Sequence, residues 1–103
     1  MNQLPMTLEL EATGVRFFSK GDEEAFFEWL GKLSFVEKYE GQGRTLFITV
    51  KGDAIDEDSL RELLSLFRRY GVDLKQLAVF DRDEFADWFR DHRAYWHKDI
   101  FGH

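Results

Sequence analysis

The amino-acid sequence predicts one α+β domain over residues 1–103, a two-layer sandwich in which helices cover one face of a mostly antiparallel sheet of four or five strands. Apolar and polar residues alternate with period two near the N-terminus, as they do in a half-buried strand. Two later segments carry apolar residues at helical spacing, and a glycine-rich turn joins two further apolar stretches, as in a hairpin. Together these patterns predict strands and amphipathic helices that share one core.

The first strand is predicted over residues 6–12, because apolar side chains alternate there with the polar residues, among them Glu9 and Glu11. A turn after this strand would return the chain as a second strand over residues 15–19. The alternative is one loop over residues 13–21. We favour the second strand, because nine residues without regular structure are long for a connection between a strand and a helix.

A helix is predicted to begin at Ser19 or Asp22, whose side chains can accept hydrogen bonds from the free N–H groups of a first turn. Its apolar stripe consists of Phe26, Phe27, Leu30 and Leu33. A second helix is predicted over residues 57–70, with Asp56 as its N-cap and Gly71 in the position of a C-terminal glycine. This helix has the clearest stripe in the chain: Leu60, Leu63, Leu64 and Phe67.

A hairpin is predicted between residues 35–40 and 44–51, with residues 41–43 as its loop. In that register Glu40 lies opposite Arg44, which is a favourable pair of opposite charges. The alternation along the two strands then gives the sheet two different faces. The buried face would carry Val36, Leu46, Ile48 and Val50. The exposed face would carry Phe35, Tyr39, Thr45, Phe47 and Thr49.

A short apolar strand is predicted over residues 77–80, followed by a third, C-terminal helix with Phe85, Trp88, Phe89 and His92 on its buried side. The element order is then that of the split-βαβ, ferredoxin-like arrangement, or of a five-stranded relative if residues 15–19 form a strand. The tail over residues 95–101 is rich in aromatic and apolar side chains, so we expect it to pack against the domain.

One motif near the C-terminus invites a catalytic interpretation. Residues 77–83, an apolar stretch that ends in Asp81-Arg82-Asp83, resemble the first motif of haloacid-dehalogenase-type phosphatases. The resemblance implies a nucleophilic first carboxylate and a general acid at the second. Phe85 stands where that family has Thr or Val, so we favour a structural role. We expect Asp81 and Glu84 to form a capping box at the start of the third helix.

Charge and residue usage exclude several functions. The net charge is −6, from 14 basic and 20 acidic residues, so a phosphate backbone is repelled and we expect no nucleic-acid partner. The chain has no cysteine, and His92 and His97 are too far apart around a helix to share an ion unless the helix ends between them, so we expect no metal and no cofactor. The lack of cysteine, of a membrane-length apolar run and of a secretory leader favours a cytoplasmic protein with no membrane partner.

Aromatic residues make up 17% of the chain, and some of them must therefore lie near the surface, where aromatic side chains are typical of partner sites. We expect an aromatic floor with acidic edges on the exposed sheet face, formed by Glu9, Glu11, Phe35, Tyr39 and Phe47. The alternative is that the tail covers these rings, because monomers rarely expose large apolar patches. An open face would suit a homodimer or a basic protein partner.

These features predict a small acidic interaction or regulatory domain that binds a protein partner or itself and performs no catalysis. In size and charge the chain resembles small acidic binding proteins such as the immunity proteins that neutralise basic toxins. The alternative is a small-ligand-binding protein or an enzyme with a cleft in the aromatic C-terminal segment. The candidate residues of that cleft are Arg93, Tyr95, Trp96, His97 and Asp99.

Overall fold

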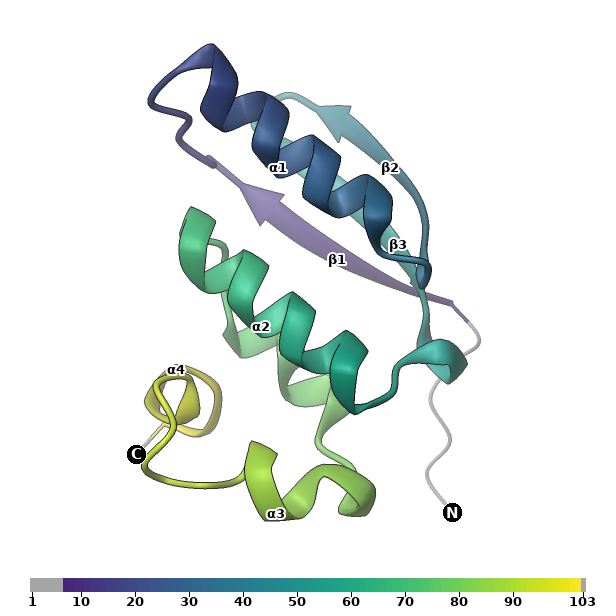
Figure 1. Ribbon diagram of the computed structural model, residues 1–103, viewed down its shortest axis with the longest axis vertical. Coiled ribbons are helices and arrows are strands. Elements are labelled where there is room, and N and C mark those ends of the chain that lie inside the picture. The colour runs from purple at the N-terminus through teal and green to yellow at the C-terminus, as the bar shows by residue number, and fades with distance from the viewer. Residues whose placement is uncertain (1–6, 103) are drawn as a thin grey trace.

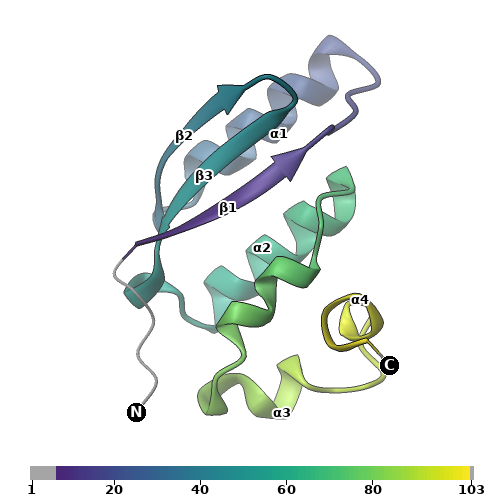
Figure 2. The same cartoon turned by 180° about the vertical axis from the view of Figure 1, so that it is seen from behind.

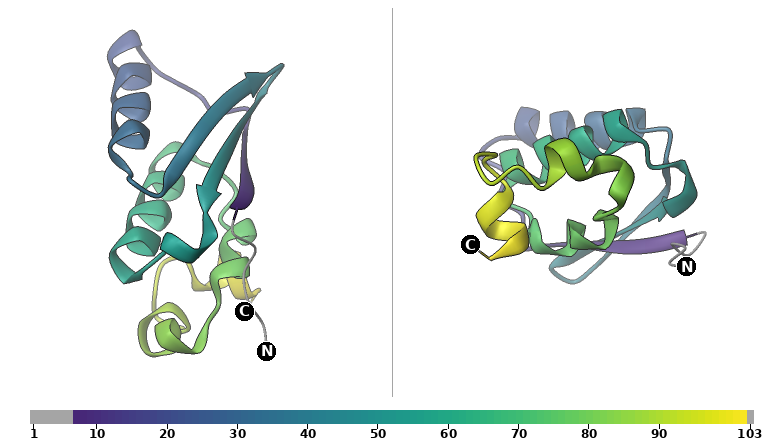
Figure 3. Two further views of the ribbon diagram at one scale, coloured as in Figure 1. Left: turned by 90° about the vertical axis from the view of Figure 1, so that its right-hand side faces the viewer. Right: turned by 90° about the horizontal axis from the view of Figure 1, so that it is seen from below.

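Two helices cover one face of a three-stranded antiparallel sheet in the computed structural model, which describes residues 7–102 (Figure 1). The strands and long helices are β1 (Thr7–Thr13), α1 (Lys20–Lys32), β2 (Val36–Gln42), β3 (Thr45–Lys51) and α2 (Glu57–Tyr70). The strand order is β1-β3-β2, so β3 is central and the other two strands form the edges. Viewed along the layers, α1 and α2 lie on one side and the sheet on the other (Figure 3).

Both long helices begin at a predicted cap. Ser19 is the N-cap of α1, and its hydroxyl accepts a hydrogen bond from the Asp22 N–H at 3.0 Å. Asp56 is the N-cap of α2, and its carboxylate accepts from the Ser59 N–H at 2.8 Å. Gly71 ends α2 with a φ of 68°, a left-handed conformation that glycine adopts without strain. The capping residues in the sequence therefore correctly predicted where both helices begin and where α2 ends.

The hairpin differs from its predicted register. Its loop has two residues, Gly43 and Arg44, so Gln42 pairs with Thr45 and Tyr39 pairs with Ile48. Glycine is required as the first loop residue, because Gly43 has a φ of 60°. The predicted three-residue loop was wrong. The change in register is odd, so it moves the β2 side chains of residues 38–42 to the opposite face relative to β3. Val36 precedes the bulge, pairs with Val50 and stays on the predicted buried face.

Two predicted strands are not strands. Residues 15–19 connect β1 to α1 without regular structure, and residues 77–80 belong to the 3₁₀ helix η2 (Lys75–Phe80). The sheet of the described residues therefore has three strands where we expected four or five, and the ferredoxin-like order is not formed. In η2, Leu77 and Phe80 are fully buried while Val79 is 41% exposed. A 3₁₀ helix places residues three apart on one side, which buries Leu77 with Phe80, whereas a strand would place Leu77 on the same face as Val79.

The third helix is much shorter than predicted. A short 3₁₀ turn, η3 (Asp83–Phe85), leads into α3 (Ala86–Phe89), which ends before the exposed His92. No side chain caps η3 or α3, so the predicted capping box is wrong. The Asp81 carboxylate instead accepts a hydrogen bond from the Arg90 side chain at 2.6 Å, which ties the end of η2 to the end of α3.

The tail packs against the domain as a further helix, α4 (His97–Phe101), which contacts η2. Trp96 is buried, and its indole N–H donates to the Phe89 carbonyl at 2.8 Å. Ile100 is buried as well. The expected docking of the tail is thus observed, and it occurs on the helical part of the molecule, away from the sheet.

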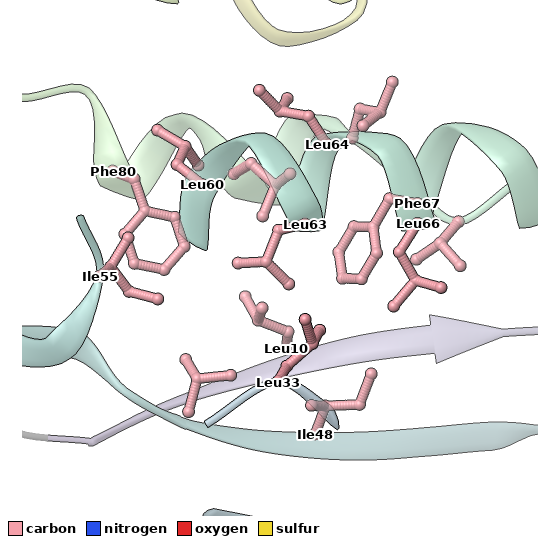
Figure 4. Close-up of a cluster of buried hydrophobic side chains, with 14 of the residues drawn as sticks. Leu10, Leu33, Ile48, Ile55, Leu60, Leu63, Leu64, Leu66, Phe67 and Phe80 are labelled. Atoms are coloured by element: carbon pink, nitrogen blue, oxygen red, sulfur yellow. The ribbon is translucent and has the colours of Figure 1, made fainter. Parts of the chain in front are cut away.

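The core lies between the sheet and α2 and continues behind α2. Figure 4 shows Leu63 directed towards Leu10 of β1 and Leu64 directed away from the sheet. Both leucines have no exposed surface. Because α2 is buried on both sides, it is the central element on which the sheet and the C-terminal segments pack.

Candidate interaction site on the open sheet face

The face of the sheet opposite α1 and α2 is not covered by any helix of residues 7–102 (Figure 2). Its side chains follow from the strand register, in rows that run across all three strands. One row is Glu11, Phe47 and Glu40; the next is Glu9, Thr49 and Lys38; the row at the hairpin end is Thr13, Thr45 and Gln42. Lys51, opposite Thr7, completes this face at the end far from the hairpin.

The centre of the face is a phenyl ring with a carboxylate on each side. Phe47 of β3 lies directly opposite Glu11 of β1 and directly opposite Glu40 of β2. Both glutamates are exposed, whereas Phe47 is half-buried between them. Directly opposed residues have Cβ atoms about 4.5–5.5 Å apart, so both glutamate side chains begin next to the ring.

A shallow hollow of about 190 Å³ opens on this face, lined by Glu9, Glu40, Gln42 and Phe47. It is smaller than the roughly 300–1,000 Å³ of a typical small-molecule pocket. Its size suits the head group of one side chain. Carboxylates bind guanidinium and ammonium groups through charge-assisted hydrogen bonds, and the face of an aromatic ring attracts the same cations.

Glu11 is held in place by a neighbour from η2. The Gln76 side-chain amide donates to the Glu11 carbonyl at 2.8 Å, and its oxygen accepts from the Glu11 N–H at 2.8 Å. A third bond, from the same amide nitrogen to the Asp73 carbonyl at 2.8 Å, fixes Gln76 itself. The backbone of β1 beside Phe47 is therefore anchored on its outer side.

Three of the five residues expected on this face are there, and two are not. Glu9, Glu11 and Phe47 lie together as predicted. Phe35 precedes β2 and is buried in the core at 3% exposure. Tyr39 pairs with Ile48 on the helix side of the sheet, where its ring lies 5.5 Å from that of Phe27 in α1. The aromatic floor of three rings is therefore wrong, because the register places a single ring between carboxylates.

The residues expected to line a C-terminal cleft point in different directions. Trp96 is buried and bonded to the Phe89 carbonyl, so its ring belongs to the core. Arg93 pairs with Asp91 at 3.1 Å, and Tyr95, 47% exposed, stacks beneath Arg68. His97 packs its ring against Phe101 at 5.0 Å. Asp99 lines a different hollow, beside the end of α2. This arrangement favours a packing role for the segment.

Two features of the surface were missed by the sequence analysis. Glu40 was assigned to an ion pair with Arg44, although the preference of hairpins for two-residue loops that begin with glycine would have placed it beside Phe47. Phe18 is 86% exposed and lies at a hollow of about 470 Å³ that also holds Arg16, Arg68 and Arg69. The cations of this hollow lie where the β1–α1 connection meets the end of α2, apart from Glu9, Glu11, Glu40 and Phe47.

Comparison of the chain with family models, with curated proteins and with solved structures finds no match. Within residues 7–102, no three histidine, aspartate or glutamate side chains gather so that they could hold a metal ion. In the same part of the chain no helix combines the length and the apolar character needed to cross a membrane. The surface geometry of the described residues therefore provides evidence for a function.

Proposed function

We propose that the chain is a non-catalytic interaction domain that binds a basic segment of a protein partner on its open sheet face. The acidic face, as we name it, consists of Glu9, Glu11, Glu40 and Phe47. The observation that carries the proposal is the cross-strand row in which Glu11 and Glu40 flank Phe47. The absence of cysteine supports a reducing, cytoplasmic setting for this interaction.

The energies favour an extended partner over a free cation. An exposed ion pair contributes about 0.2–1 kcal/mol, and an exposed cation–π contact about 0.5–1 kcal/mol. Three carboxylates and one ring then supply at most about 4 kcal/mol, which corresponds to a dissociation constant near 1 mM. A protein segment with several Arg or Lys residues, and with backbone and apolar contacts besides, can bind more tightly than that.

The charge pattern also orients the partner. Lys38 and Lys51 lie on the same side of the sheet at the end far from the hairpin, whereas Glu11 and Glu40 lie nearer the hairpin. Glu9 shares the row of Lys38, so a basic segment is attracted most strongly to the hairpin half of the face and much less to the half that holds the two lysines. The net charge of −6 adds a long-range attraction that raises the rate of association at low salt.

The proposal is tested by reversing charge on the face and, as a control, elsewhere. The double variant Glu9→Lys/Glu11→Lys removes two carboxylates from the acidic face. The control Glu24→Lys/Asp87→Lys makes the same change of net charge at exposed positions of α1 and α3. We expect the first pair to weaken binding of an arginine-rich peptide by about tenfold or more, and the control to weaken it much less.

A further variant separates the ring from the charges. Phe47→Thr keeps a residue suited to a strand but removes the phenyl ring. We expect weaker peptide binding with an unchanged dependence on salt, because the number of charges is the same. Equal losses in the face variant and the control variant would show that the peptide responds only to net charge, and the proposal would then be wrong.

A further inference from the structure

We propose that two copies of this chain associate through the outer edge of β2, antiparallel and around a twofold axis at Tyr39. The pairing would join two three-stranded sheets into one sheet of six strands. It concerns the edge of the sheet, whereas the proposed function concerns the face. Glu40 belongs to both, so the cysteine variants at positions 39 and 41 test the edge without changing a residue of the acidic face.

The direction in which the β2 backbone groups point can be derived from the hydrogen bonds of Glu11 in β1. The N–H and carbonyl of Glu11 bond to Gln76, so they point away from β3. In an antiparallel ladder the bonding direction alternates, so Phe47, opposite Glu11, directs its own groups towards Glu40 of β2. Tyr39 and Gly41 then direct theirs outwards, and no backbone group among residues 7–102 bonds to them there.

The two edges of the sheet therefore differ in whether their outward backbone groups are hydrogen-bonded. At β1, the Gln76 side chain satisfies the outward groups in the middle of the strand. At β2, every residue from Glu37 to Gln42 is exposed. Proteins usually cover or block a free edge, because its unpaired groups invite another strand. The unblocked edge is thus the one at which a second strand can add.

The charges on β2 select one register for a second copy. Outward-pointing residues must pair with outward-pointing residues, so the possible twofold centres are single residues of β2. A centre at Lys38 opposes two lysines, and a centre at Glu40 opposes two glutamates, which is unfavourable. A centre at Gly41 places Glu40 opposite Gln42 and forms no pair of opposite charge. A centre at Tyr39 places Lys38 of each copy opposite Glu40 of the other, which forms two such pairs and is therefore the favoured register.

The side chains on the helix side of the sheet are compatible with a twofold axis at Tyr39. Tyr39 lies on the helix side of the sheet and is 43% exposed, with its ring against Phe27. At the proposed axis the two Tyr39 residues would lie opposite each other and cover part of that exposed surface. The bulge between Val36 and Lys38 restricts regular pairing to the residues that follow it, which are those of the proposed contact.

Charge reversal on β2 tests the register with the full-length chain. The native mass of the wild type is expected to be twice the chain mass of 12.2 kDa at high protein concentration. Lys38→Glu and Glu40→Lys should each raise the dissociation constant of the dimer by about tenfold or more, because like charges then face each other. The double variant Lys38→Glu/Glu40→Lys should restore the dimer. Circular dichroism and melting temperature serve as controls for folding.

A cysteine placed at the axis gives an independent readout. The chain has no cysteine, so Tyr39→Cys introduces a single thiol. Hydrogen-bonded partners in an antiparallel pair have Cα atoms about 5.5 Å apart, within the range of a disulfide. Gly41→Cys is the matched control, because residue 41 lies opposite residue 37 of the other copy, and the two introduced thiols would be about 13 Å apart along the strands.

We expect Tyr39→Cys to form a covalent dimer under mild oxidation much faster than Gly41→Cys. Gly41 has no heavy atom within 4 Å of an added Cβ, so the control variant should fold normally. A wild type that stays monomeric at every concentration, a double charge swap that fails to restore the dimer, or equal rates of oxidation at both positions would each overturn the proposal. None of these outcomes bears on binding of a basic peptide to Glu9, Glu11 and Phe47.

Discussion

The side-chain amide of Gln76 pairs with the backbone of Glu11 as a neighbouring strand would, donating to its carbonyl and accepting from its N–H, both at 2.8 Å. This contact joins η2, which contains the residues predicted as a strand, to the outer edge of β1. It also fixes the backbone beside Phe47, at the centre of the acidic face. The same interaction thus closes one edge of the sheet and positions one wall of the candidate site.

Replacing Gln76 should open the edge of β1. Gln76→Leu removes three hydrogen bonds while keeping a side chain of similar size. We expect a loss of roughly 1.5–4.5 kcal/mol in the free energy of unfolding, since each of the three bonds contributes about 0.5–1.5 kcal/mol. Urea unfolding measures the loss, and amide exchange should accelerate at Glu11. Gln42→Leu, at an exposed position of β2, is the control; an equal effect there would contradict the edge contact.

The Leu64→Ala variant tests whether the side of α2 that faces away from the sheet is buried. This side chain has no exposed surface, so Leu64→Ala leaves a cavity that the neighbours cannot fully close. We expect a loss of about 2–5 kcal/mol in unfolding free energy. Ser65→Ala, at the adjacent exposed position, should change stability by less than about 0.5 kcal/mol. A loss at Leu64 as small as that at Ser65 would mean that the two faces of α2 are assigned incorrectly.

The docking of the C-terminal segment depends mainly on Trp96. Trp96→Ala removes a buried ring and leaves the Phe89 carbonyl without its donor, so we expect a loss of about 3–5 kcal/mol in unfolding free energy. Tyr95→Ala removes a half-exposed ring whose contact with Arg68 contributes at most about 1 kcal/mol. Chemical denaturation of both variants gives the comparison. Two equally mild losses would indicate that the segment is not anchored by Trp96.

The cap of α2 predicts a defined dependence of stability on pH. The Ser59 backbone N–H donates to the Asp56 carboxylate and lowers its pKa below the ordinary value of 3.8. Because the folded-state pKa is the lower one, the stabilisation is complete well above pH 3.8 and is lost as the pH falls through the folded-state pKa. The difference in unfolding free energy between wild type and Asp56→Ala should therefore be constant near neutral pH and shrink in acid.

Asp56→Asn is the control for this measurement. Asparagine keeps an oxygen that can cap the helix but does not titrate, so most of the stability at neutral pH should remain. The stability of this variant should lack the contribution of Asp56 to the acid dependence. A difference between wild type and Asp56→Ala that stays constant down to about pH 2 would exclude the carboxylate as the titrating group.

The parts of the fold that depend on local signals could be predicted from the sequence. For α2, the cap at Asp56, the spacing of the leucines and the glycine at position 71 all lie within the helix or next to it. Residues 77–80 could not be assigned, because a four-residue apolar run is compatible with a strand and with a 3₁₀ turn. The choice was made by tertiary contacts, namely the burial of Leu77 and Phe80 and the bond from Gln76 to β1.

The candidate site was predicted only in part, because the length of the β2–β3 hairpin loop was predicted incorrectly. A loop of two residues instead of three changes the hairpin register by an odd number, so Tyr39 and Glu40 exchange faces. Glu9, Glu11 and Phe47 were placed correctly, because they belong to β1 and β3 and do not depend on β2. The position of Phe35 was missed because it precedes β2 and enters the core.

The central claim, that a basic partner binds the acidic face, is tested most directly by mapping a bound peptide on the isotopically labelled chain. An arginine-rich peptide is titrated at moderate salt while the amide resonances are followed by NMR. We predict saturable shifts centred on Glu9, Glu11, Glu40 and Phe47. Shifts centred instead on the exposed acidic residues at the start of α2, or a lack of saturation at any position, would contradict the account.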